Sequence, residues 1–192
     1  MLATRLAELR GVAVLVASYY VGFLALGFVT GNPQTWYYAV FLAVLLGLVL
    51  FWDSRHHFSP LVIWGLAAWG ALHMAGGLVR VDDDRVLYNV WLLPFVRFDH
   101  VVHAWGFGFA GLAVWESLRN RLRGLGSGAG LVVLGGLAFG AVNEMIEFLI
   151  TRIVPNTNIG DFENTGWDLV ANTVGALVAA AWVHLRHASI RQ

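Results

Sequence analysis

Hydrophobic residues run through this chain in six long, nearly continuous stretches separated by short polar segments. The stretches cover residues 11–31, 36–52, 60–79, 98–118, 131–150 and 167–185. Each is close to the roughly 20 apolar residues that an α-helix needs to cross the hydrocarbon core of a bilayer. None shows the apolar–polar alternation of a membrane β-strand. The pattern therefore predicts an all-α, polytopic membrane helix bundle of about six transmembrane helices.

Composition agrees with this fold class. Hydrophobic residues make up 58% of the chain and charged residues 12%, whereas about 25% of the residues in an ordinary soluble domain are charged. A soluble fold of 192 residues could not hide so much apolar surface, but a bilayer removes the need to hide it. We predict a single integral-membrane domain over residues 1–192. Its basic and then apolar N-terminus is too long for a signal peptide and is expected to be a retained first span.

The connecting segments predict an orientation. All twelve basic residues are arginines, and eight of them lie in the segments on the same side as the two termini. Basic residues concentrate in cytoplasmic loops. We therefore expect a multi-pass protein of a bacterial cytoplasmic (inner) membrane with both termini in the cytoplasm. Residues 86–96 (VLYNVWLLPFV) are too few to span, and we expect them to lie in the membrane interface or to fold back as a lid.

Polar and ionisable residues inside the spans gather toward one end of the predicted bundle. They are His73, Asp99, His100, His103, Asn143, Glu144, Glu147, Asp168 and Asn172. A charged group at the centre of a transmembrane helix costs at least about 2.5–3.5 kcal/mol, so these residues need an explanation. At a rise of about 1.5 Å per residue, four spans place them at similar depth, whichever way the protein points.

Their spacing along each helix indicates shared faces. Asp99 and His103 are four residues apart, and Glu144 and Glu147 are three apart, so each pair projects from one side of its helix. Histidine nitrogens and carboxylate oxygens together suit a divalent metal such as zinc, manganese or iron, which the residue types do not distinguish. The predicted metal ligands are Asp99, His103, Glu144, Glu147, Asp168 and His73. Glu147 or Asp161 would be the base that activates water.

Simpler interpretations stay open for several of these residues. His73 could be an interhelical hydrogen-bonding residue, and Asp99 and Asp168 could cap the helices that they begin. Asn143 and Asn172 are typical of polar contacts between membrane helices.

Gly136 and Gly140 form a pair of small residues four apart, which predicts a close helix contact on the fifth span.

Three short stretches resemble uncharacterised bacterial inner-membrane proteins of the YjdF type. They are FDHVVH at 98–103, EMIEF at 144–148 and GDFENTGWD at 160–168. These are similar to an Asp-x-x-x-His helix start, a Glu-x-x-Glu-aromatic motif and a Gly-Asp-x-x-Asp-Thr-x-Trp-Asp signature, in which Asn164 replaces the middle acid. Residues 168–176 are also similar to the Asp-x-x-x-Asn-x-x-Gly pattern of VanZ-like membrane proteins. The first resemblance implies the fold and the site but no established activity.

Three functions fit this sequence. The leading hypothesis is a metal site near the outer leaflet, hydrolytic toward a membrane lipid or an envelope precursor. The second is an ion- or proton-coupled transporter, which requires a polar path to the other side. The third is an accessory or assembly subunit whose polar cluster only locks the bundle. The formal net charge of zero argues against nucleic acid as a partner, and the absence of cysteine excludes thiolate chemistry.

Overall fold

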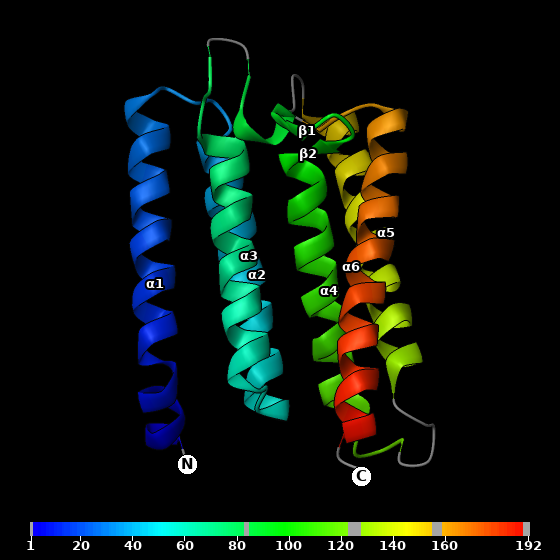
Figure 1. Ribbon diagram of the computed structural model, residues 1–192. Coiled ribbons are helices and arrows are strands. Elements are labelled where there is room, and N and C mark those ends of the chain that lie inside the picture. Colours follow the sequence, from blue (N-terminus) through cyan, green and yellow to red (C-terminus); the bar gives the residue numbers. More distant parts are fainter. Residues whose placement is uncertain (1, 83–84, 123–127, 155–158, 190–192) are drawn as a thin grey trace.

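The computed structural model describes residues 2–82, 85–122, 128–154 and 159–189, and within these residues it contains six long helices (Figure 1). They are α1 (Leu2–Val29), α2 (Thr35–His56), α3 (Pro60–Leu78), α4 (Phe98–Leu118), α5 (Ala129–Ile153) and α6 (Phe162–Ser189). The predicted all-α membrane bundle is confirmed. The sixth helix begins five residues before the predicted span, at Phe162 instead of residue 167.

The helices run lengthwise beside one another, and both chain ends lie at the same end of the bundle (Figure 1). The closest packing is among α4, α5 and α6, while α3 packs on α4 and α1 packs on α3. Five helices are long and apolar enough to cross a membrane, and α4 is the exception. Its first two turns carry Asp99, His100 and His103, which lower its hydropathy. Because α3, α5 and α6 surround it, α4 needs less apolar surface than its neighbours.

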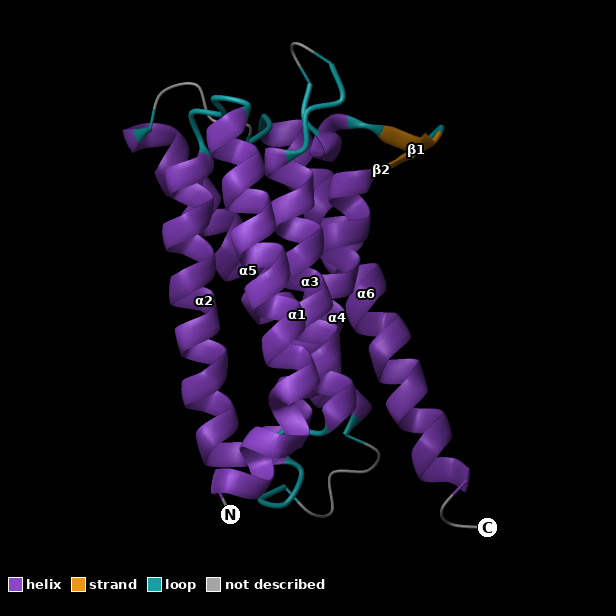
Figure 2. Cartoon of the chain, turned by 90° about the vertical axis from the view of Figure 1, so that its left-hand side faces the viewer, coloured by secondary structure: helices purple, strands orange, loops and turns teal. Residues whose placement is uncertain are grey.

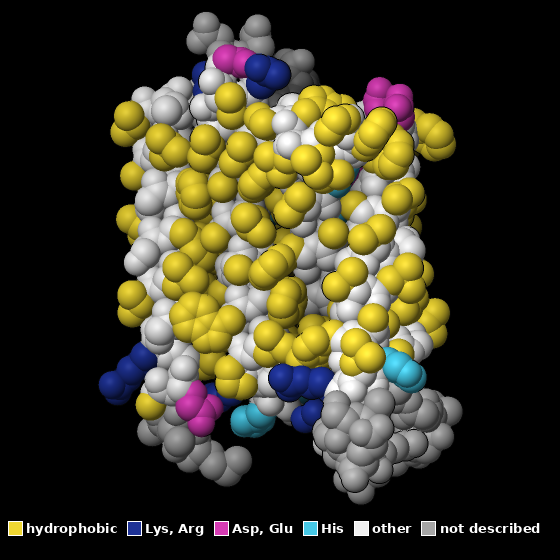
Figure 3. All heavy atoms as spheres, viewed as in Figure 1, with side chains coloured by type: hydrophobic (Ala, Val, Ile, Leu, Met, Phe, Trp, Pro, Cys, Tyr) yellow, Lys and Arg dark blue, Asp and Glu magenta, His cyan; other side chains and the backbone are white. Residues whose placement is uncertain are grey.

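The outer surface suits a lipid environment. Hydrophobic side chains cover the side of the bundle seen in Figure 3, and charged side chains lie mainly at its two ends. Many large apolar residues are exposed to the surroundings, including Val44, Phe148 and Leu177. Such a surface is unfavourable in water and favourable in hydrocarbon. The structure therefore describes a multi-pass membrane protein.

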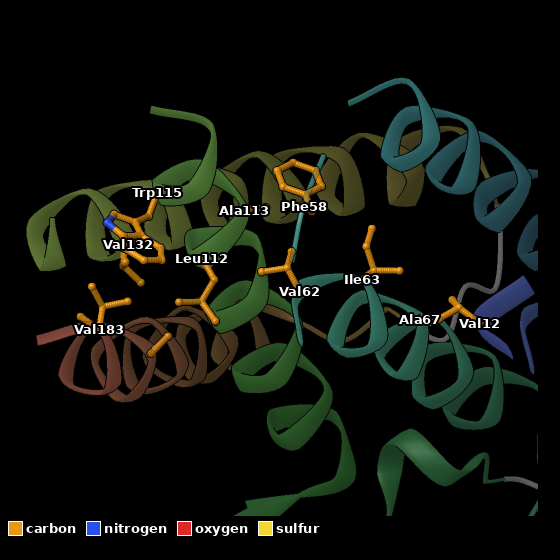
Figure 4. Close-up of a cluster of buried hydrophobic side chains, with 12 residues drawn as sticks. Val12, Phe58, Val62, Ile63, Ala67, Leu112, Ala113, Trp115, Val132 and Val183 are labelled. Carbon is orange, nitrogen blue, oxygen red and sulfur yellow. The ribbon is translucent and has the colours of Figure 1, made fainter. Parts of the chain in front are cut away.

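Glycines allow the polar half of the bundle to pack closely. A Cβ added at Gly136 would lie 2.7 Å from the Phe107 carbonyl oxygen, and one at Gly140 would lie 2.6 Å from Asn172 Nδ2. Both distances are too short for a side chain, so the predicted small-residue contact on the fifth span is confirmed. Near the end that carries the chain termini, apolar side chains fill the interior instead. Phe58 and Val62 form part of this cluster (Figure 4).

The described part of the connection from α3 to α4 contains secondary structure of its own. It contains a short 3₁₀ helix, η1 (Leu87–Asn89), and an antiparallel hairpin of β1 (Trp91–Leu93) and β2 (Val96–Arg97). The hairpin projects beyond the side of the bundle (Figure 2), and Trp91, Leu93 and Phe95 are exposed on it. Apolar side chains that project sideways at the end of a membrane bundle are placed as interfacial anchors would be.

A buried ion pair ties α1 to the α2–α3 junction. Arg5 Nη2 lies 2.5 Å from Asp53 Oδ1 and donates to the Phe58 carbonyl oxygen at 2.8 Å. Asp53 is only 5% exposed and also accepts a hydrogen bond from the Phe58 backbone N–H at 2.9 Å. The hydrogen bond to Asp53 raises the pKa of Arg5. This contact was not anticipated from the sequence, because residues 48 positions apart carry no local pattern that links them.

Arg5→Ala is expected to destabilise the bundle because it leaves the buried Asp53 carboxylate without its main cationic partner. A loss of about 1–3 kcal/mol would lower the thermal unfolding midpoint in detergent by about 2–10 °C. Arg10→Ala is the matched control, because Arg10 is exposed on the same helix. Equal midpoints for the two variants would show that the Arg5–Asp53 pair contributes no stability.

Candidate metal site

His103 lies at the centre of the polar cluster, buried between α4, α5 and α6. Its Nδ1 is 3.4 Å from Glu144 Oε1 and 3.1 Å from Asn172 Oδ1. Its Nε2 is 3.6 Å from Asp99 Oδ1 and 4.0 Å from Asp168 Oδ1. Both ring nitrogens therefore face oxygen atoms, which come from all three helices.

Four of the predicted ligands converge tightly. His103, Glu144, Glu147 and Asp168 each offer one ligand atom, and these four atoms lie within 4.8 Å of one another. His103, Glu144 and Asp168 are buried, and Glu147 is half-buried. Asp99 lies beside the group through its contact with His103. The arrangement arises because α4 begins, α5 ends and α6 begins at the same end of the bundle.

Several cluster oxygens lack well-formed hydrogen bonds, although the side chains of Asn143 and Asn172 are close enough to Glu144 to interact with it. Both carboxylate oxygens of Glu144 and Oδ1 of Asp168 are buried, and no well-formed hydrogen bond reaches them from the described residues. Glu144 is 6% exposed and Asp168 is 0% exposed. Buried polar atoms in proteins are nearly always paired, so such oxygens call for a proton or a cation. The oxygen-rich set with one histidine fits a hard or borderline divalent ion.

Amide side chains hold the remaining oxygens in place. Asn164 Nδ2 donates to Asp168 Oδ2 at 2.5 Å and to Asp99 Oδ2 at 3.4 Å. Asn143 Nδ2 donates to Glu147 Oε1 at 2.7 Å.

The contact of Asn172 with His103 agrees with its expected interhelical role. The part played by Asn164 was not anticipated. Its four-residue spacing from Asp168 was the available signal, and it marks a shared helix face.

A cavity of about 270 Å³ leads to the cluster from the end of the bundle away from the chain termini. His73, Asp99, His103, Glu147 and Asn164 all line it. His73 is not among the four converging groups. His73 instead forms part of the cavity wall.

Tyr88 of η1 positions the His73 ring. The Tyr88 hydroxyl lies 2.5 Å from His73 Nδ1 and 3.1 Å from the His73 carbonyl oxygen. Burial raises the pKa of Tyr88, so the hydroxyl keeps its proton and can donate it. The simpler interpretation of His73, as a hydrogen-bonded residue, therefore describes the contact that the structure shows.

The structure separates the roles of two acids near the start of α6. Because α6 starts at Phe162, Asp168 lies in its second turn and is fully buried. The cap suggested as an alternative for Asp168 belongs to Asp161, whose Oδ1 accepts the Asn164 backbone N–H at 3.1 Å. Asp161 is exposed and lies outside the cavity lining. His100, for which no functional role was predicted, is buried on the other side of α4.

The fold and the cluster define a class: a polytopic helical membrane protein with a buried carboxylate–histidine group near one end. The family described as "Predicted membrane protein (DUF2238)" has a sequence model that matches residues 11–189 of this chain. The chain belongs to that family. No curated protein and no solved structure gives a significant match.

Asn164→Asp is expected to destabilise the protein when metal is withheld. The substitution replaces a donor by a third carboxylate beside Asp168 and Asp99, so a favourable contact becomes a repulsive one. We expect a thermal midpoint in chelator that is lower by several degrees. Asn89→Asp, in η1 at the same end, serves as the control. An unchanged midpoint for Asn164→Asp would mean that Asn164 does not hold the two acids.

Proposed function

We propose that this protein binds a divalent metal ion within the membrane and uses it to hydrolyse a lipid or an envelope precursor. The observation that carries the metal proposal is the convergence of His103, Glu144, Glu147 and Asp168 within 4.8 Å. Three of these are carboxylates, and a divalent cation would offset most of their charge. Burial of an uncompensated carboxylate costs several kcal/mol, so a cation stabilises the folded bundle as well as the site.

Hydrolysis follows from the chemistry of such a site rather than from any matched relative. A divalent ion would lower the pKa of water and polarise an oxygen of the substrate. Glu147 is half-buried, lines the cavity and is oriented by Asn143. It is therefore the better-placed base of the two predicted. Asp161 caps α6 outside the cavity, and in this proposal it does not act on water.

The end of the bundle at which the cavity opens bears on the orientation of the protein in the membrane and on which substrates can reach the site. The end with the chain termini carries Arg5, Arg10 and Arg55, so we infer that it faces the cytoplasm of a bacterial inner membrane. The cavity would then open toward the outer leaflet, where a lipid headgroup could reach it. The likeness to YjdF-type and VanZ-like proteins stays a prediction from the sequence motifs.

The packing below the cluster favours a binding site over a transport path. Every residue that lines the cavity belongs to the half of the bundle away from the termini. Beneath it, the Phe107 ring packs 5.7 Å from the His103 ring, and Trp69 packs on Phe107. A transporter needs polar groups that continue to the opposite side. Among the described residues, apolar side chains close that route.

Metal analysis of the purified protein is expected to find about one divalent ion per chain. Removal of the ion by a chelator should lower the thermal midpoint, because ligand binding to the folded state stabilises it. Glu144→Gln and His103→Gln should each lose most of the bound metal, since each removes a ligand at the centre of the cluster.

Glu163→Gln is the matched control. Glu163 is exposed at the start of α6 and is not among the converging groups, so this variant should keep its metal. Substoichiometric metal in wild-type protein, together with a midpoint unaffected by chelator, would rule out the metal site. If Glu144→Gln then raised the midpoint, the cluster would be a structural lock, as in an accessory subunit.

A further inference from the structure

α4 and α6 each carry a second stripe of residues that faces away from the metal cluster. On α6, Asp168 and Asn172 lie against His103, and Asn164 donates to Asp168. Other residues of the same turns, among them Trp167, Val170 and Ala171, line an apolar groove. On α4, the same division separates Asp99 and His103 from the groove. The groove runs between the two helices, from His100 to Leu112 on α4 and from Trp167 through Val174 to Trp182 on α6.

The groove is long and open to the membrane. Its volume is about 610 Å³. At a rise of about 1.5 Å per residue, it extends about 18 Å along α4, from His100 to Leu112, and about 22 Å along α6, from Trp167 to Trp182. Such a length exceeds one leaflet, which is about 15 Å of a roughly 30 Å hydrocarbon core. A narrow apolar channel along the membrane normal has the shape of a lipid acyl chain.

Two buried donors mark the upper end of the groove. His100 Nδ1 accepts the Arg97 backbone N–H at 3.2 Å, so a neutral His100 ring carries its proton on Nε2. Nε2 is buried, and no well-formed hydrogen bond reaches it from the described residues, although the Phe95 carbonyl is close enough to interact with it. Arg97 Nε is likewise buried without a partner among those residues. The Arg97 side chain also lines the neighbouring recess, so its terminal guanidinium nitrogens can donate to an oxygen of a molecule bound there.

A recess of mixed charge adjoins this end of the groove. Arg97, Asp161 and Glu163 line it, with Trp91 and Trp167 as aromatic walls. Trp167 lines both the recess and the groove, so the two spaces adjoin at this ring. Arg97 also lies over the Trp91 ring at 5.3 Å. A guanidinium suits a phosphate, and two carboxylates suit an ammonium group.

We propose that this face binds one phospholipid with a zwitterionic, phosphoethanolamine-type headgroup. One acyl chain lies in the groove. The phosphate accepts from Arg97, and the ammonium group lies against Asp161 and Glu163. A second copy of the chain could cover the apolar groove, but it would leave the charges of the recess uncompensated. The lipid site uses none of the proposed metal ligands, although the charge of Arg97 also acts on Asp168, so metal content is measured for every variant.

Native mass spectrometry of the delipidated protein, titrated with dioleoyl phosphatidylethanolamine or dioleoyl phosphatidylglycerol, tests the site. We expect tighter binding of the ethanolamine lipid. Arg97→Gln should weaken its binding at least about tenfold, by loss of a charge-assisted contact. The double variant Asp161→Asn/Glu163→Gln should remove the preference over the glycerol lipid. Asn is itself a good helix cap, so this variant should still fold.

Matched controls separate the specific site from general lipid contact. Arg85→Gln removes an exposed arginine at the same end and should leave binding unchanged. Val174→Phe fills the groove and should weaken binding of both lipids, whereas Val44→Phe adds the same bulk on exposed α2. Equal binding of the two lipids by all variants would overturn the proposal. A Val174→Phe variant that changed its oligomeric state but kept its lipid binding would also overturn the proposal. If the metal content is the same in every variant, a change in lipid binding reflects the lipid site and not the metal site.

Discussion

Carboxylates buried in a membrane bundle have to be protonated, hydrogen-bonded or bound to a cation, and the polar half of this protein is built around that requirement. Glu144 and Asp168 are almost inaccessible, yet they lie within reach of the same histidine. Asn164, Asn143 and Asn172 satisfy some of the oxygens and nitrogens and leave others open. Glycines on α5 bring the backbones close enough for these short side chains to meet. A bound cation would coordinate the carboxylate oxygens that no well-formed hydrogen bond reaches from the described residues.

Much of the fold followed from the apolar pattern, because a bilayer permits few solutions for long apolar segments. The convergence of Asp99, His103, Glu144 and Asp168 at one end also followed, since it needs only correct counting of spans. The start of α6 did not. Residues 162–166 are polar enough to read as a loop, but Asp161 caps the helix there. That shift moved Asp168 from an expected helix end into the buried centre.

Contacts between residues far apart in the chain could not be predicted from the sequence. Nothing near Arg5 indicates that it pairs with Asp53, and nothing near Tyr88 indicates that it reaches His73. The two faces of α4 were also not separable in advance. His100 and His103 are three residues apart, yet one borders the lipid-facing groove and the other lies in the metal cluster. Packing against α6 decides which side each ring takes, so α4 divides an internal polar site from a membrane-facing apolar one.

The most direct test of the central claim is an X-ray structure of the purified protein with anomalous diffraction data at the absorption edge of the metal. The account predicts one peak between His103, Glu144 and Asp168, at about 2.0–2.2 Å from the histidine nitrogen and from the carboxylate oxygens of these two acids, with Glu147 beside it as the base. A map without a peak there, in crystals grown with the metal and with the four side chains paired to one another or to water, would contradict it.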